Sequence, residues 1–190
     1  MSTSKICHFL IGIPGSGKST FAHALAKLDN YVIVSTDEIR AALYGDAKIQ
    51  GNWNEVENQV IVLIGNAIAS GKSVIYDATN CKRAFRLDFL MKVEAKNLIW
   101  IAWYLKTPIE ICMKWNQQRD RQVPPEIIAS MYKSLLDFPP RRHEGFAAVE
   151  EIDMTALQPG TEVVEQIERI QNLHCRIINR TQHNGITLKL

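Results

Sequence analysis

The stretch that decides the fold is Gly12-Ile13-Pro14-Gly15-Ser16-Gly17-Lys18-Ser19. It satisfies the pattern G-x-x-x-x-G-K-[ST], whose glycines let consecutive backbone N–H groups point inward and surround a β-phosphate. A helix beginning near Lys18 would add its positive dipole end at the same place. Lys18 is expected to neutralise the β- and γ-phosphates of ATP, and the Ser19 hydroxyl to ligate Mg²⁺. The predicted phosphate-binding residues are Gly12, Pro14, Gly15, Ser16, Gly17, Lys18, Ser19 and Thr20.

The segments around this loop alternate between strand-like and helix-like patterns. An apolar run over residues 6–11 precedes the loop, as expected for a strand buried on both faces of a parallel sheet. Ser35 and Glu38 have the spacing of a capping box at the start of a later helix. Strands alternating with helices of crossover length predict an α/β fold with a parallel sheet. Strands are expected at 6–11, 31–34, 73–76, 98–105 and 146–152, and helices at 18–28, 35–43, 55–70, 82–95, 109–121, 124–136 and 161–173.

Composition places the chain among ordinary globular proteins. It has 190 residues, 46% hydrophobic and 22% charged, which suits one domain with one core. The net charge of +2 neither demands nor excludes a nucleic-acid partner. The four scattered cysteines suggest neither a disulfide framework nor a zinc site. The first apolar run is too short for a signal peptide or a membrane span, so we expect a cytoplasmic protein without membrane contact.

The domain is expected to cover residues 1–172 and to include a helical lid at about 108–137. Asn, Gln, His and Gly accumulate in residues 173–190, which we interpret as a C-terminal tail. Nothing in the pattern predicts the oligomeric state.

Residues that follow the strands are the candidates for binding the phosphate acceptor, because ligands of parallel sheets bind at the carboxyl ends of the strands. Asp37 follows the second strand, with Arg40 three residues later on the same helical face. Asp77, Thr79 and Asn80 follow the third strand. Asp77 would hold the Mg²⁺ shell through water or contact the acceptor. Structural roles stay open for both acids, since Asp37 also suits a first helical turn and Asp77 a turn after a strand.

Further cations lie outside these segments. Arg119 and Arg121 are expected to end the helix over residues 109–121, where they would close over the transferring phosphoryl group or simply stabilise the helix C-terminus. A second set of basic side chains would bind along a phosphate backbone or, as we favour, form a solvated surface. This set is Arg83, Arg86, Lys133, Arg141, Arg142 and His143.

Over roughly residues 5–136, the chain resembles the 5′-hydroxyl polynucleotide kinase modules of phage polynucleotide kinase-phosphatases. Residues 12–20 resemble the phosphate loop of these modules, and Asp37 with Arg40 match their D-x-x-R motif. Residues 77–80 are similar to their D-T-N turn, with Ala78 as an extra residue. Val123-Pro124 followed by residues 130–134 resembles a segment near their lid.

The resemblance implies a P-loop NTPase fold, a three-layer arrangement with five parallel strands in the order 2-3-1-4-5 and a helical lid. By the same resemblance Asp37 would be the general base, Arg40 would bind near the acceptor phosphate, Arg119 would contact the ATP phosphates and Asp77 would shape the acceptor site. We therefore expect an ATP- and Mg²⁺-dependent kinase that acts on a nucleic-acid 5′ end. A small-molecule kinase with a hydroxyl substrate and a non-catalytic nucleotide-binding regulatory protein remain alternatives.

Overall fold

The computed structural model describes residues 5–27, 29–93, 98–156, 172–173 and 176. The chain divides into two compact units, Met1–Met154 and Thr155–Leu190, and the sheet and the site belong to the first. The predicted tail over residues 173–190 and the predicted helix over 161–173 fall outside the described residues, apart from a few isolated positions. The domain end expected at residue 172 therefore stays a prediction. Within the described part of the chain, no helix combines the length and apolarity needed to cross a membrane.

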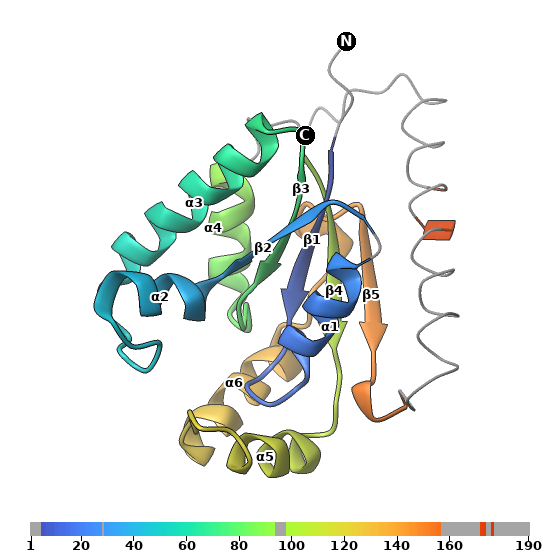
Figure 1. Cartoon of the computed structure of the whole chain (residues 1–190). Coiled ribbons are helices and arrows are strands. Elements are labelled where there is room, and N and C mark those ends of the chain that lie inside the picture. The colour runs from blue at the N-terminus through green and yellow to red at the C-terminus, as the bar shows by residue number, and fades with distance from the viewer. Residues whose placement is uncertain (1–4, 28, 94–97, 157–171, 174–175, 177–190) are drawn as a thin grey trace. The chain divides into compact units, whose positions relative to one another are not determined.

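A five-stranded parallel sheet forms the centre of the first unit (Figure 1). The strand order is β2-β3-β1-β4-β5, which confirms the expected topology. In the register of the sheet, Phe9 on β1 pairs with Tyr76 on β3 and Ala102 on β4. Since all strands are parallel, their carboxyl ends meet at one edge of the sheet. The strands are β1 (Lys5–Ile11), β2 (Tyr31–Ser35), β3 (Ser73–Asp77), β4 (Leu98–Leu105) and β5 (Ala148–Ile152).

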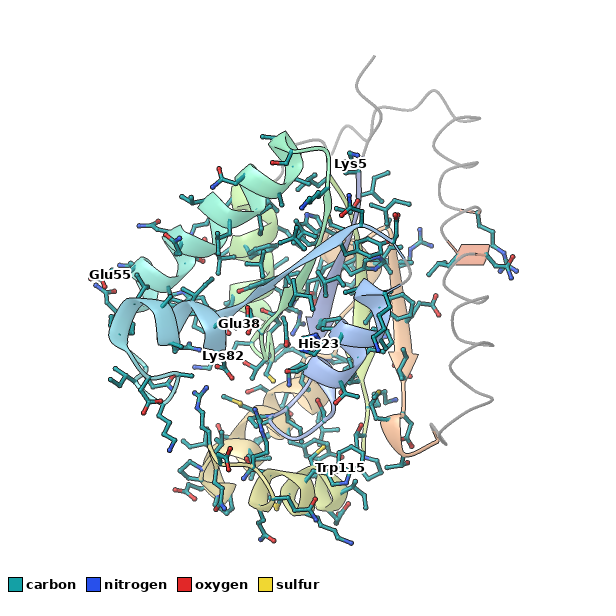
Figure 2. The ribbon with its side chains drawn as sticks, viewed as in Figure 1. Lys5, His23, Glu38, Glu55, Lys82 and Trp115 are labelled. Carbon is teal, nitrogen blue, oxygen red and sulfur yellow. The ribbon has the colours of Figure 1, made fainter. Side chains whose placement is uncertain are left out.

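Helices cover both faces of the sheet, as the alternating sequence pattern predicts (Figures 1 and 2). Two helices, α3 and α4, lie against one face, and α1 lies against the other, while α5 and α6 lie beyond the carboxyl ends of the strands (Figure 1). The helices are α1 (Lys18–Ala26), α2 (Thr36–Tyr44), α3 (Trp53–Ala69), α4 (Arg83–Val93), α5 (Ile109–Gln117) and α6 (Pro125–Asp137).

Aromatic rings fill the core between the sheet and α4. The ring of Phe9 lies within 5.1–6.1 Å, centroid to centroid, of Tyr76, Phe89, Trp100 and Phe146. Phe9 itself is fully buried. Such edge-to-face and tilted contacts add to the burial of large apolar rings. This cluster anchors β1, whose carboxyl end leads directly into the phosphate loop.

Caps explain where α2 and α3 begin. The Ser35 hydroxyl accepts a hydrogen bond from the Glu38 backbone N–H at 3.5 Å, which confirms Ser35 as the N-cap of α2. The Asn52 side chain accepts one from the Asn54 N–H at 3.0 Å and caps α3. Because of this cap, α3 begins at Trp53, two residues earlier than the pattern of apolar residues predicts.

Arg86 lies in the interior, so the favoured assignment of this residue to a solvated surface is wrong. Its side chain is fully buried, and its guanidinium contacts both carboxylate oxygens of the equally buried Glu144, at 2.7 and 2.9 Å. It also donates to the backbone carbonyls of Asn80, Cys81 and Phe138. A fully paired charge of this kind is tolerated in a protein core. Arg86 thereby fixes the turn that follows β3.

Candidate active site

The phosphate loop joins β1 to α1 with the backbone geometry that its glycines permit. Gly15 and Gly17 have φ values of 80° and 88°, in the left-handed region that side chains disfavour. The Gly12 N–H donates to the Thr79 carbonyl at 3.0 Å, and the Thr107 hydroxyl donates to the Ser16 carbonyl at 3.0 Å. The segments that follow β3 and β4 therefore hold the loop from both sides.

Gly15 supplies the first testable prediction, because a Cβ there would overlap the Cys112 backbone carbonyl. Gly45 has nearly the same φ, 81°, but nothing lies within 4 Å of its would-be Cβ. Gly45→Ala should cost about 1–2 kcal/mol of unfolding free energy through backbone strain alone. Gly15→Ala should cost about 1–3 kcal/mol more through overpacking and should also weaken ATP binding.

Urea unfolding and ATP titration of the two variants side by side would measure this difference. Equal losses of stability, together with unchanged ATP affinity of Gly15→Ala, would mean that Cys112 does not constrain the loop.

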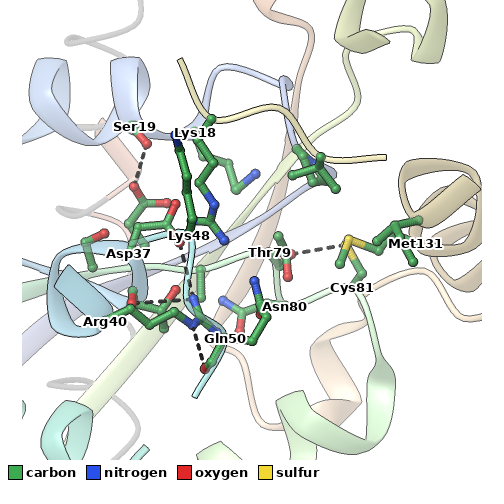
Figure 3. Close-up of a pocket in the computed structure, with 18 of the residues that line it drawn as sticks. Lys18, Ser19, Asp37, Arg40, Lys48, Gln50, Thr79, Asn80, Cys81 and Met131 are labelled. Carbon is green, nitrogen blue, oxygen red and sulfur yellow. Dashed lines mark hydrogen bonds and ion pairs between the residues drawn. The ribbon is translucent and has the colours of Figure 1, made fainter. Parts of the chain in front are cut away.

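Lys18 and Ser19 lie at the start of α1 (Figure 3), and Lys18 has polar partners inside the loop. Lys18 Nζ donates to the Ile13 carbonyl at 2.8 Å and contacts Ser16 Oγ at 3.5 Å. Burial lowers the pKa of Lys18, and the negative charge of Asp77 partly offsets this effect. A polyanionic phosphate tail would compensate the same burial by favouring the charged ammonium.

Ser19 and Asp77 have the donor types that suit Mg²⁺. Ser19 Oγ donates to Asp77 Oδ2 at 2.9 Å, which joins the first turn of α1 to the end of β3. Hydroxyl, carboxylate and water oxygens, with phosphate, are the usual ligands of Mg²⁺ at nucleotide sites. These two side chains would hold the ion, and a bound Mg²⁺ neutralises charge on the phosphates.

Asp37 lies on the first turn of α2 and contacts two arginines. Arg40 Nη1 lies 3.2 Å and Arg121 Nη1 lies 2.6 Å from the same oxygen, Asp37 Oδ1. Arg40 also contacts the carbonyls of Thr36 and Gln50, each at 3.4 Å. The Asp37 side chain is still 44% exposed, so it remains accessible to a substrate.

Thr79 and Asn80 line the same cavity, but their hydrogen bonds brace the loop. The Thr79 carbonyl accepts the Gly12 N–H, and Asn80 Nδ2 donates to the Leu10 carbonyl at 2.7 Å. Asn80 has a positive φ of 50°, a conformation that asparagine tolerates better than most residues. The turn after β3 thus ties the expected acceptor side to the phosphate side.

Arg119 and Arg121 lie in the loop after α5 instead of on the helix, which corrects the predicted helix end. α5 ends at Gln117. The Asn116 side chain exchanges two hydrogen bonds with the backbone of Val123, at 2.9 and 3.0 Å, and closes the loop between them. From this loop Arg121 reaches Asp37, and Arg119 lines the cavity near Lys18.

One cavity of about 930 Å³ brings the predicted residues of both sides together. Pro14, Lys18 and Ser19 line it from the phosphate loop, while Gly12, Gly15, Ser16, Gly17 and Thr20 belong to the rest of the loop and the first turn of α1. The acceptor-side candidates that line it are Asp37, Arg40, Asp77, Thr79, Asn80 and Arg119. The lining residues that sequence patterns do not indicate include Lys48, Gln50, Trp53, Lys82 and Phe85.

A parallel five-stranded sheet with this loop after β1 defines the class of P-loop nucleotide-binding proteins. The family comparison agrees with this class, because a family model described as an AAA domain matches residues 8–137. This match covers more than half of the chain, so the chain belongs to this family of P-loop proteins.

Two curated relatives are similar to the chain over about two thirds of its length. The L-seryl-tRNA(Sec) kinase of Methanococcus maripaludis is 32% identical over 135 residues, which are 65% of this chain and 50% of that protein. A putative bifunctional polynucleotide kinase/RNA ligase of Autographa californica nuclear polyhedrosis virus is 28% identical over 153 residues, which are 72% of this chain and 22% of that protein. The chain thus spans half or less of the length of these relatives.

A solved structure supports the fold. A chain of the Pnkp1/Rnl/Hen1 RNA repair complex superposes with a TM-score of 0.64 at 24% identity, over 72% of this chain and 46% of that chain. At this identity the likeness concerns the fold alone.

Proposed function

We propose that this protein transfers the γ-phosphoryl group of ATP to a hydroxyl acceptor, the 5′-hydroxyl of a polynucleotide. The observation that carries the proposal is the single cavity in which Lys18 and Ser19 of the phosphate loop lie with Asp37 and Arg40 of α2. Phosphoryl transfer needs positioning and charge neutralisation around the phosphate, and a base beside the attacking hydroxyl. The cavity supplies both kinds of group.

Each of these residues has its own task in the proposed reaction. Lys18 neutralises the β- and γ-phosphates, and Arg119 supplies a second cation from the lid loop. Asp37 accepts the proton of the acceptor hydroxyl. The oxygen of that hydroxyl forms a bond to the γ-phosphorus at the same time. The bond from that phosphorus to the β–γ bridging oxygen breaks, and ADP leaves with the bridging oxygen's electron pair.

The two oxygens of Asp37 are assigned different tasks. Both arginine contacts are made to Oδ1, so we assign Oδ2 to the acceptor hydroxyl. Arg40 then lies beside the acceptor, where its guanidinium suits a backbone phosphate.

The charge of the cavity and the relatives favour a nucleic-acid acceptor. Basic side chains outnumber acidic ones among the lining residues, six against four. A surplus of cations is the usual electrostatic feature of a site that tracks a phosphate backbone. Both curated relatives carry names that refer to RNA or a polynucleotide as substrate. The basic set is Lys18, Arg40, Lys48, Lys82, Arg119 and Arg121, and the acidic set is Asp37, Glu57, Asp77 and Asp120.

A second candidate acceptor is the hydroxyl of a seryl group carried by a tRNA. The 32% identity to an L-seryl-tRNA(Sec) kinase favours it specifically. The chemistry at Asp37 is the same for both acceptors, since each presents a primary alcohol attached to a nucleic acid. A small free alcohol, or nucleotide binding without transfer, are the remaining alternatives.

A labelling assay tests the proposal. The protein is incubated with γ-labelled ATP and Mg²⁺ and, in parallel, with 5′-hydroxyl oligonucleotides of RNA and DNA, seryl-tRNA, or a panel of small alcohols and sugars. We expect label on the 5′ ends of the oligonucleotides. Label confined to seryl-tRNA would move the assignment to the second candidate. Label confined to small molecules would remove nucleic acid as the acceptor. ATP binding without any transfer would indicate a regulatory protein.

A further inference from the structure

A pair of stacked aromatic rings forms one wall of the cavity. The rings of Trp53 and Phe85 are 5.9 Å apart and 15° from parallel, and both residues line the cavity. Trp53 begins α3 and packs against the hydrophobic core, whereas Phe85, near the start of α4, is 49% exposed. Phe89 lies one turn further along α4 and is only 3% exposed. Phe85 is therefore an apolar ring that the fold supports from behind and leaves accessible at the site.

We propose that Phe85, backed by Trp53, is a stacking platform for the terminal base of the nucleic-acid acceptor. This inference rests on the proposed function and narrows it, because it assigns a site for a base in addition to sites for the hydroxyl and the phosphate. Stacking on aromatic side chains is the usual way in which proteins bind unpaired bases, and it tolerates every base because each has a π-face.

Contacts from Tyr44, at the end of α2, support the platform. The Tyr44 hydroxyl donates to Glu55 Oε2 at 2.9 Å and accepts the Asn52 N–H at 3.1 Å, and these contacts flank Trp53 on both sides in sequence. Gly51 has a φ of 59°, and a Cβ there would overlap the Tyr44 ring. These contacts join the loop before α3 to the end of α2, next to Trp53, whose ring stacks on Phe85.

The platform is also linked to the acceptor arginine. Arg40 Nε donates to the Gln50 carbonyl, three residues before Trp53, at 3.4 Å, and Arg40 Nη1 contacts Asp37. Arg40 therefore connects the assigned general base, Asp37, with the loop that carries Trp53. The groups assigned to the hydroxyl, the phosphate and the nucleobase of the acceptor lie next to one another. Figure 3 shows Arg40, Lys48 and Gln50 close together among the residues that line the cavity.

Cations accompany the platform. Lys82 Nζ lies 5.4 Å from the centre of the Phe85 ring, and Lys48 lines the same cavity. A cation over an exposed ring gains modestly from the negative π-face, and it is free to move to a phosphate when a base covers the ring. Aromatic rings interleaved with basic side chains are typical of sites for single-stranded nucleic acid. A site for a neutral sugar would not need these cations.

The test compares two oligonucleotides that differ only at the acceptor end. One carries an ordinary 5′-nucleoside, and the other carries an abasic 5′ residue that keeps the hydroxyl and the phosphate. We expect the wild-type protein to have a lower KM for the ordinary end. Phe85→Ala should raise that KM by roughly 5- to 150-fold, the range that corresponds to the loss of one stacked base, while the KM for ATP stays unchanged. It should also abolish the preference over the abasic end.

Matched variants separate stacking from folding. Phe85→Tyr should restore the preference, whereas Phe85→Leu, which keeps apolar bulk without a flat ring, should not. Phe138→Ala is the control and should leave both the KM and the preference for a base unchanged. Phe138 is 56% exposed and lies outside the residues that line the cavity.

The outcomes also separate this inference from the proposed function. If the wild-type protein labels oligonucleotides and Phe85→Ala keeps the full preference for a base, the platform is wrong while the kinase assignment stands. If the wild-type protein labels neither oligonucleotide, the polynucleotide 5′-hydroxyl is overturned as the acceptor, and the platform is overturned with it.

Discussion

Replacing Asp37 with Asn is expected to slow phosphoryl transfer by roughly 100-fold or more, the usual contribution of a general base. The amide keeps the size and shape of the side chain but cannot accept the proton of the acceptor hydroxyl. ATP affinity should be unchanged, because Asp37 lies on α2 and the phosphate loop lies between β1 and α1. Single-turnover transfer from labelled ATP, together with an ATP titration, measures the two quantities separately.

Glu38→Gln is the matched control for this variant. Glu38 lies in the same first turn of α2, is exposed and carries the same charge, so the change alters the helix end in the same way. It should leave transfer within the range of the wild-type protein. Unchanged turnover of Asp37→Asn, or an equal loss in both variants, would exclude Asp37 as the base.

Replacing Glu144 with Gln is expected to lower the free energy of unfolding by about 3–5 kcal/mol, as for other buried ion pairs that lose one partner. The guanidinium of Arg86 would remain fully buried, with carbonyl oxygens but no opposing full charge from Glu144. Urea unfolding measures the loss. Asp137→Asn breaks an exposed ion pair with Lys133 and should cost less than about 1 kcal/mol.

A double variant distinguishes a lost charge partner from a general disturbance of packing. Arg86→Met combined with Glu144→Met removes both charges, so it should recover part of the stability that Glu144→Gln loses. A loss in Glu144→Gln no larger than that in Asp137→Asn would contradict the structural role assigned to this pair.

The sequence predicts the sheet well because its signals are local. The run Leu98–Leu105 is apolar throughout, and the structure places β4 over the same residues. The order β2-β3-β1-β4-β5 follows from the resemblance, and the phosphate loop follows from glycines whose positive φ values the structure shows at Gly15 and Gly17. For the strand and for the loop, the residues that decide the conformation are neighbours in the chain.

The features that the sequence does not predict depend on contacts between distant residues. Arg86 has the same local surroundings as a surface cation, and only its pairing with Glu144, 58 residues away, brings it into the core. Trp53 and Phe85 become a pair only when α3 and α4 pack side by side. The end of α5 depends on the Asn116 side chain binding Val123, which helix propensity does not reveal.

In the candidate site, too, some residues are predicted by local motifs and others are not. Lys18, Ser19, Asp37, Arg40 and Asp77 were indicated by motifs, and the structure brings them to one cavity. Arg121 was indicated only as one of two lid cations, yet it contacts Asp37 at 2.6 Å. Its position depends on the fold of the loop after α5, so no local pattern distinguishes it from Arg119.

Calorimetric titration of the purified protein with ATP, in the presence and absence of Mg²⁺, tests the central claim most directly. The claim is that the loop between β1 and α1, with Lys18 and Ser19, binds a nucleoside triphosphate. We predict saturable binding at one site per chain that strengthens clearly when Mg²⁺ is present. Absence of any ATP binding under both conditions would contradict it.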